Sequence, residues 1–99
     1  MAQHERDVIA QYADDLAQLI DVSSVLRNLT KRRLFTASLA FEVNKKRPEE
    51  RATRLLEILV CRGSRAFREF CSVLKEEGEV ELAYNMLRDS YQKPVEIFW

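Results

Sequence analysis

The sequence predicts an all-α fold, a six-helix antiparallel bundle, on three observations. The chain has 99 residues, which is enough for one domain with one hydrophobic core. Only two Gly and two Pro occur, too few turn residues for a sheet-rich fold. Apolar side chains recur at the i, i+3, i+4, i+7 spacing of an amphipathic helix in six successive segments, with short connections that suit antiparallel neighbours.

Three helices are expected in the first half of the chain. The first is expected to be one long helix, with its apolar positions between residues 8 and 20. A second should begin after Asp21, whose carboxylate suits the N-cap, and cover residues 22–29. A third should begin after Thr36, another N-cap residue, and cover residues 37–44.

Three more helices are expected in the second half. Pro48 suits the first position of the fourth helix, and Gly63 suits the left-handed position that ends it. Ser64 is expected to cap the fifth helix, so the Arg-Gly-Ser joint would reverse the chain with almost no loop. Gly78 should end the fifth helix, and a sixth should include residues 82–87.

The apolar stripes also predict the core. Leu56 of the fourth helix and Phe67 of the fifth are expected to be fully buried. Either Phe35 or Phe41 should close the core beside the third helix. Beyond the sixth helix, Pro94 bars further helix, so we expect residues 1–91 to form the domain and residues 92–99 to be a tail or the start of a linker.

We expect a cytoplasmic location and reduced cysteines. No apolar run approaches the roughly 20 residues that span a bilayer, and the first residues lack the pattern of a signal peptide. A structural disulfide is therefore not expected, and two thiols alone do not make a zinc site. Cys71 lies on an apolar stripe and should be buried, whereas Cys61 is closer to a helix end and should be partly exposed.

No catalytic, metal or cofactor site is expected. The single histidine, His4, lies near a terminus, and adjacent acidic residues on a helix point in different directions and make poor acid–base pairs. The two glycines stand alone, so no phosphate-binding glycine loop occurs. The residues therefore favour binding over catalysis.

The charges are segregated along the chain although they sum to zero. Residues 1–26 carry one Arg and five acids, a net charge of −4. Residues 27–54 carry nine Lys or Arg and three Glu, a net charge of +6. Residues 55–99 carry six basic and eight acidic residues, a net charge of −2. Such segregation predicts a basic surface and an acidic surface on one molecule.

The basic middle has two alternative interpretations. The basic clusters at residues 31–33 and 45–47 match a bipartite nuclear-localisation pattern, but the predicted helix between them should hide it. A small basic nucleic-acid-binding domain is the runner-up function, although interleaved acids and the neutral total disfavour it. Ion pairing on helix faces accounts for part of the pattern, and Glu50 with Arg54 has the spacing of such a pair.

Residues 55–78, "LLEILVCRGSRAFREFCSVLKEEG", resemble the caspase recruitment domain (CARD) family of the death-fold superfamily. That family has a Leu- and Ile-rich fourth helix, an Arg-Gly or Lys-Gly joint, an Ala-Phe pair and a glycine before a final Leu-Ala helix. The matching positions here are Leu55, Leu56, Ile58, Leu59, Arg62, Gly63, Ala66, Phe67, Phe70, Leu74, Gly78, Leu82 and Ala83. Upstream, "LTKRRLFTASLAFEVN" is similar to the passage from helix 2 to helix 3. The closest likeness is to the CARDs of initiator caspases and of the adaptors that recruit them.

The resemblance implies a non-catalytic domain that recruits or clusters a CARD-containing partner in apoptotic or inflammatory signalling. The partner would be an initiator caspase or an apoptosome- or inflammasome-type adaptor, and a head-to-tail homo-oligomer is a further expectation; membranes and nucleic acids are not expected partners. CARDs commonly dock a charged patch on helices 1 and 4 against an opposite patch on helices 2 and 3.

Two sets of charged residues are the expected contacts. The basic set comprises Arg27, Lys31, Arg32, Arg33, Lys45, Lys46, Arg51 and Arg54. The acidic set comprises Asp14, Asp15, Glu49 and Glu50. In the best-known caspase–adaptor pairing the caspase is basic on helices 1 and 4, so the polarity here is inverted or mixed.

Overall fold

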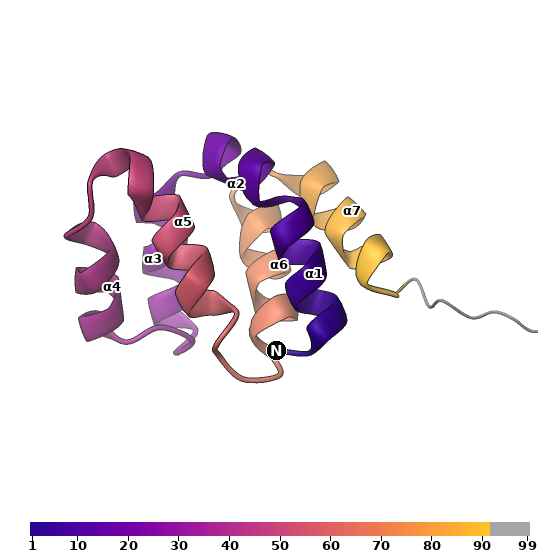
Figure 1. Ribbon diagram of the computed structural model, residues 1–99, viewed down its shortest axis with the longest axis horizontal. Helices are drawn as coiled ribbons and strands as arrows, with labels where there is room; N and C mark the ends of the chain where they lie inside the picture. The colour runs from indigo at the N-terminus through magenta and orange to yellow at the C-terminus, as the bar shows by residue number, and fades with distance from the viewer. Residues whose placement is uncertain (92–99) are drawn as a thin grey trace, which may run out of the picture.

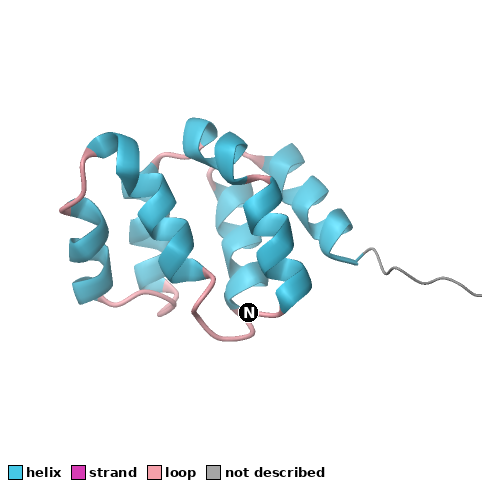
Figure 2. Cartoon of the chain, viewed as in Figure 1, coloured by secondary structure: helices cyan, strands magenta, loops and turns pink. Residues whose placement is uncertain are grey.

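The computed structural model describes residues 1–91, and these residues form seven helices (Figure 1). The helices are α1 (Gln3–Gln11), α2 (Ala13–Leu19), α3 (Val22–Lys31), α4 (Ala37–Asn44), α5 (Pro48–Leu59), α6 (Ala66–Glu76) and α7 (Val80–Tyr91). Within residues 1–91 there is no strand, so the predicted all-α class is confirmed (Figure 2). The predicted tail at residues 92–99, with Pro94, lies outside the described residues. The expected domain boundary at residue 91 therefore stays a prediction.

The predicted single first helix is divided into α1 and α2 at Tyr12. Tyr12 has backbone angles φ −100° and ψ 8°, outside the α region, and it both ends α1 and precedes α2. Tyr12 also makes a tertiary contact at the division, since its hydroxyl donates a hydrogen bond to Asp89 of α7 over 2.5 Å. The change in direction (Figure 1) leaves Val8, Ile9 and Leu16 all buried in one core.

Most of the predicted helix ends are confirmed. The Asp21 carboxylate accepts a hydrogen bond from the backbone N–H three residues later at 3.4 Å, and the Thr36 hydroxyl accepts the equivalent bond at 3.1 Å. Pro48 is the first residue of α5, where its missing N–H leaves no helical bond unmade. Gly78 has φ +94° directly after α6, the left-handed conformation that glycine adopts without steric cost.

The predicted tight joint between α5 and α6 is wrong. The two helices are separated by residues 60–65, a loop that is visible in Figure 1. Gly63 does not have a positive φ, and Ser64 does not cap α6, which has Arg65 at its N-cap. The glycine is therefore part of an open loop instead of a helix-terminating turn.

Contacts with distant segments explain why this loop is longer than the sequence indicates. The Arg62 Nε donates a hydrogen bond to the carbonyl of Leu34 over 2.8 Å, across the start of the bundle. The Arg62 carbonyl in turn accepts a bond from the amino group of Met1 over 2.9 Å. The bond from Met1 satisfies the backbone carbonyl of Arg62, which a tight turn would have satisfied locally, and the Arg62 side chain ties the loop to Leu34.

Three phenylalanines form the centre of the core. Phe35, Phe67 and Phe70 are each at most 2% exposed, and Leu56 is 6% exposed. The prediction of Leu56 and Phe67 as core residues is therefore confirmed. Of the two candidates beside the third predicted helix, Phe35 is buried and Phe41 is 65% exposed.

Helix α6 is bound to α3 by polar contacts as well as by packing. The Ser24 hydroxyl and the Asn28 side-chain amide both donate to Oε2 of Glu77, just after α6, over 2.6 and 2.8 Å. Arg32, directly after α3, forms ion pairs with two glutamates of α6. A charged acceptor makes such hydrogen bonds stronger than neutral ones, so α3 is held in a fixed position on α6.

Replacing Phe67 with alanine should destabilise the domain strongly. Removal of a fully buried phenylalanine costs about 3–5 kcal/mol, because both apolar burial and core packing are lost. Urea unfolding followed by circular dichroism measures the free energy of unfolding. Tyr84→Ala is the matched control, since Tyr84 is 61% exposed and the change should cost less than about 1 kcal/mol. An unchanged stability of the Phe67 variant would contradict its place in the core.

The Tyr12–Asp89 hydrogen bond should make stability depend on pH in the acid range. The hydrogen bond from Tyr12 lowers the pKa of Asp89 below its ordinary value. A lowered pKa in the folded state gives stabilisation that is present above the unfolded-state pKa, about 3.9, and is lost as the pH falls below it. Tyr12→Phe should therefore destabilise the protein at pH 7 and have a smaller effect at pH 3, in urea titrations at both values. An equal difference at the two pH values would show that Asp89 does not mediate the effect.

Candidate functional site

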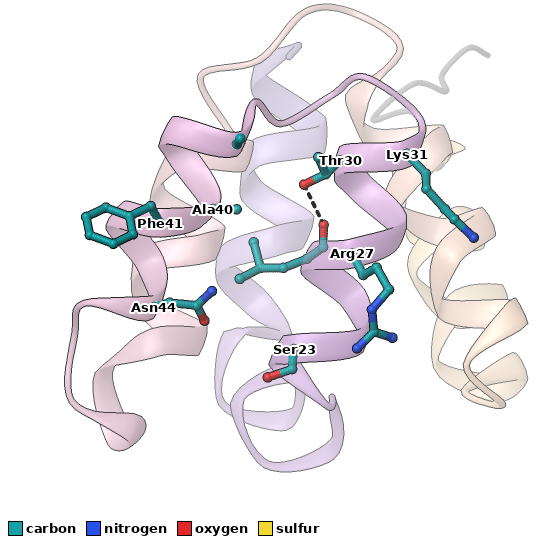
Figure 3. Close-up of a pocket in the computed structure, with 9 residues that line it drawn as sticks. Ser23, Arg27, Thr30, Lys31, Ala40, Phe41 and Asn44 are labelled. Atoms are coloured by element: carbon teal, nitrogen blue, oxygen red, sulfur yellow. Dashed lines mark hydrogen bonds between the residues drawn. The ribbon is translucent and has the colours of Figure 1, made fainter.

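A groove of about 630 Å³ lies on the surface between α3 and α4 (Figure 3). Leu26 of α3 and Ala40 of α4 are among the residues lining it. Arg27 and Lys31 lie on its α3 side, and Phe41 lies on its α4 side. We refer to this feature as the α3–α4 groove. It combines apolar surface with two cations and an aromatic ring.

The helical repeat explains why the two cations lie together. Arg27 and Lys31 are four residues apart and therefore lie on the same face of α3. Thr30, between them, turns its hydroxyl inward and donates to the carbonyl of Leu26 over 2.8 Å. Neither cation forms an ion pair with any residue in the range 1–91, and both are exposed. Their charges are thus available to a partner.

Phe41 is the residue that the predicted site lacked. The sequence predicts it only as a core candidate, yet its side chain is exposed and its ring points away from α3 (Figure 3). An exposed aromatic side chain is typical of interaction surfaces, where aromatic residues are enriched. The sequence signal was available, because Phe41 lies two residues before Val43 on α4, and Val43 is fully buried. Residues two apart on a helix do not share a face.

Lys45 and Lys46 extend the basic surface around Phe41. The Lys45 ammonium lies 5.7 Å from the centre of the Phe41 ring, within the range of a cation–π contact. Both lysines line a second depression with Phe41, of about 440 Å³. Arg51 is partly exposed and donates from Nε to the carbonyl of Lys46 over 2.9 Å, so it supports the α4–α5 connection. These lysines border the α3–α4 groove without lining it.

Arg32 does not belong to the same surface. Its guanidinium forms ion pairs with Glu69 at 2.7 Å and Glu76 at 2.5 Å, and its side chain is 24% exposed. The hydrogen bond to Glu69 raises the Arg32 pKa above its ordinary value. The prediction of Arg32 as part of one basic patch with Arg27 and Lys31 thus overlooked its contact with α6, which gives it a structural role.

Arg54 is also paired within the molecule. It bonds to Glu42 of α4 and to Glu57 on its own helix, where the distance is 3.1 Å. The bond from Arg54 lowers the pKa of Glu42. The predicted pair of Glu50 with Arg54 is wrong, because Glu50 lies 3.9 Å from Arg47 instead. The reason is tertiary: α4 brings Glu42 close to Arg54, and the sequence spacing alone does not show this.

Arg33 lies at a third place, beside the α5–α6 loop. It follows α3 with φ +64° and lines a pocket with Arg62 and Arg65. The eight predicted basic residues are therefore spread over the α3–α4 groove, the end of α4, the first turns of α5 with Arg51, two intramolecular ion-pair clusters and this pocket.

The four predicted acidic residues lie on two helices. All four are exposed: Asp14 and Asp15 in the first turn of α2, Glu49 and Glu50 in the first turn of α5. Helix α2 packs against α5. An apolar groove of about 300 Å³ is lined by residues of α1, α2 and α5. None of the four lines this groove, whereas Glu57, which the sequence reasoning missed, does.

The remaining predictions for the described residues concern metal binding, membrane helices and cysteines. No group of three or more His, Cys, Asp or Glu within residues 1–91 is arranged to hold a metal ion. No helix in that range is both long and apolar enough to cross a membrane. Cys71 is buried as predicted, and burial raises its pKa to about 12. Cys61 is exposed in the α5–α6 loop.

Comparison with known proteins identifies one family. The model of the caspase recruitment domain family matches residues 6–89, which run from α1 to α7 and include the α3–α4 groove. No curated protein matches the chain.

The two cysteines should differ sharply in reactivity. The thiolate is the reactive form, so the exposed Cys61 should be modified by a disulfide reagent in the folded protein while Cys71 is protected. We expect one equivalent of thiol in native buffer and two in denaturant, counted with Ellman's reagent. The Cys61→Ser variant should then show no rapid reaction in native buffer. Rapid reaction of both thiols in the folded wild type would contradict the burial of Cys71.

Proposed function

This chain belongs to the caspase recruitment domain family, and from that premise we propose that it recruits or clusters a CARD-bearing caspase or adaptor. CARDs are non-catalytic death-fold domains that bind other CARDs in apoptotic and inflammatory signalling. The first of the six family helices corresponds to α1 and α2 together, and the remaining five correspond to α3 to α7.

The observation that carries the proposal is the α3–α4 groove. Arg27 and Lys31, which form no ion pair within residues 1–91, suit a negatively charged partner. The apolar lining from Leu26 and Ala40 suits an apolar side chain at the centre of the contact, and Phe41 adds an exposed ring beside it. We propose that the partner docks the acidic surface of its first and fourth helices here. Exposed ion pairs are individually weak, so such a contact would be sensitive to salt and readily reversed.

The opposite surface of this chain would be formed by α2 and the start of α5. Asp14 and Asp15 are exposed and form no ion pair within residues 1–91. Glu49 and Glu50 are exposed too, but both lie close to Arg47, at 3.8 and 3.9 Å, so they add less acidic character to this surface. A molecule with one basic and one acidic surface can associate head to tail with its own copies. This kind of contact is heterologous and tends to produce open arrays. We therefore include a head-to-tail homo-oligomer in the proposal.

The remaining predicted residues receive different roles. We propose that Lys45 and Lys46 form the outer part of the basic surface, because they flank Phe41. Arg32 and Arg54 would support the fold instead, since glutamates of this chain already neutralise them. We also propose a cytoplasmic location, as family membership suggests, and place the domain at residues 1–91 with residues 92–99 as its tail or linker.

Reversing the charge of Arg27 and Lys31 together tests the basic surface. Arg27→Glu/Lys31→Glu should weaken partner binding and self-association about tenfold or more, because two attractions become repulsions. Arg68→Glu/Lys75→Glu is the matched control, with the same charge change on exposed residues of α6. Sedimentation velocity measures self-association, affinity capture identifies the partner, and circular dichroism checks that each variant is folded.

Mixing two variants tests the head-to-tail arrangement directly. Arg27→Glu/Lys31→Glu keeps the acidic surface, and Asp14→Lys/Asp15→Lys keeps the basic surface. Neither should self-associate, but an equal mixture should form a heterodimer through the two intact surfaces. Absence of the heterodimer, with both variants folded and the wild type associating, would contradict this contact. Captured partners that disappear on nuclease treatment would show a nucleic-acid-binding surface instead.

A further inference from the structure

Three arginines line one pocket at the α5–α6 loop, and we infer that this pocket binds a phosphate-bearing small molecule. Arg33, Arg62 and Arg65 share a pocket of about 330 Å³ with Leu34, Gly63 and Ser64. No carboxylate lines the pocket, and none of the three arginines forms an ion pair within residues 1–91. The site is separate from the α3–α4 groove, so the inference does not rest on the proposed function.

The backbone of Arg33 indicates that its side chain has a use. With φ +64°, Arg33 is the one residue other than glycine with a positive φ among residues 1–91. This left-handed conformation brings the Cβ too close to the carbonyl oxygen, so glycine or asparagine is the usual choice after a helix. An arginine at this position is disfavoured by the backbone alone. Arg33 is one of the residues that line the pocket, and a positive charge there gives a physical reason for its presence.

Arg62 is held in place before any ligand arrives. Its Nε donates to the carbonyl of Leu34 over 2.8 Å, and its own carbonyl accepts a bond from Met1 over 2.9 Å. The terminal nitrogens of its guanidinium have no partner among the described residues. A guanidinium that is fixed at Nε can present the edge that carries its two terminal nitrogens to an oxyanion.

The loop supplies further donors beside the arginines. The backbone N–H groups of Gly63, Ser64 and Arg65 donate to no described acceptor, and the Ser64 hydroxyl has no described partner. Apart from its chain neighbours, no described residue has a heavy atom within 4 Å of the position that a Cβ would take at Gly63, so the loop is open at this point. Successive N–H groups together with guanidinium groups are typical of phosphate sites.

The number of cations selects the ligand class. Three uncompensated positive charges around one pocket repel one another, and a single polyanion relieves all three repulsions at once. Phosphate oxygens accept the paired N–H bonds that guanidinium groups donate, and a diphosphate offers more charge than a carboxylate. A compound with a diphosphate or larger phosphate group therefore fits the pocket best.

Titration with pyrophosphate tests the inference. Isothermal titration calorimetry at constant ionic strength should show saturable binding with a Kd below about 1 mM. Arg33→Gly and Arg65→Ala should each raise the Kd about tenfold, because each removes one charged hydrogen-bonding group. Arg47→Ala is the matched control, an exposed helix-capping arginine elsewhere on the surface, and it should leave the Kd unchanged.

Arg33→Gly also separates binding from folding. Glycine adopts φ +64° without the steric cost that arginine incurs, so this variant should keep or raise the melting temperature while it loses pyrophosphate affinity. A misfolded variant would show the opposite change in melting temperature. Amide chemical shifts measured by NMR should move at the α5–α6 loop in the wild type on titration.

Three results would overturn the inference. They are absence of saturation, equal loss of affinity in Arg47→Ala, and shift changes confined to α3 and α4. The outcome is independent of the proposed CARD contact, because Arg27→Glu/Lys31→Glu should retain pyrophosphate binding and Arg33→Gly should retain self-association. Failure of one proposal therefore does not decide the other, which has its own measurement.

Discussion

Helix α6 must be covered on more than one side, because Cys71 and Val73, which are two residues apart and do not share a face, are both at most 1% exposed. Helices α3 and α7 provide that cover, and both pack against α6. Helix α3 in turn packs against α4 and α5, and α1 packs against α7, so the whole bundle is assembled outward from α6. Any change that prevents burial of α6 removes the surface on which these helices are arranged.

The fixing of α3 on α6 also decides which cations can face a partner. Arg32 is used to hold the two helices together, through Glu69 and Glu76. Arg27 and Lys31 line the α3–α4 groove and form no ion pair within residues 1–91. One run of basic residues in the sequence thus has two physical roles, because consecutive residues on a helix point in different directions.

The same separation places the two candidate binding features at different locations. The α3–α4 groove has apolar surface with charged edges, which suits a protein partner of opposite charge. The pocket at the α5–α6 loop is lined mainly by arginines and loop backbone, which suits a small oxyanion. Lys31 lines the groove, and Arg33, two residues further along the chain, lines the pocket. A ligand bound at Arg33 would therefore leave the groove open to a protein partner.

The sequence by itself determined the features that depend on neighbouring residues. Helix ends at Asp21, Thr36 and Gly78 follow from local hydrogen bonding and backbone conformation, and apolar periodicity located most of the core. Only the tertiary structure decided the features that depend on distant residues. The hydrogen bond at the Tyr12 division joins it to Asp89, which is 77 residues away, and whether Arg32 or Arg54 is ion-paired depends on the helix packed beside it. A pattern along the chain records which residues share a helix face, whereas an ion pair between helices depends on which faces meet.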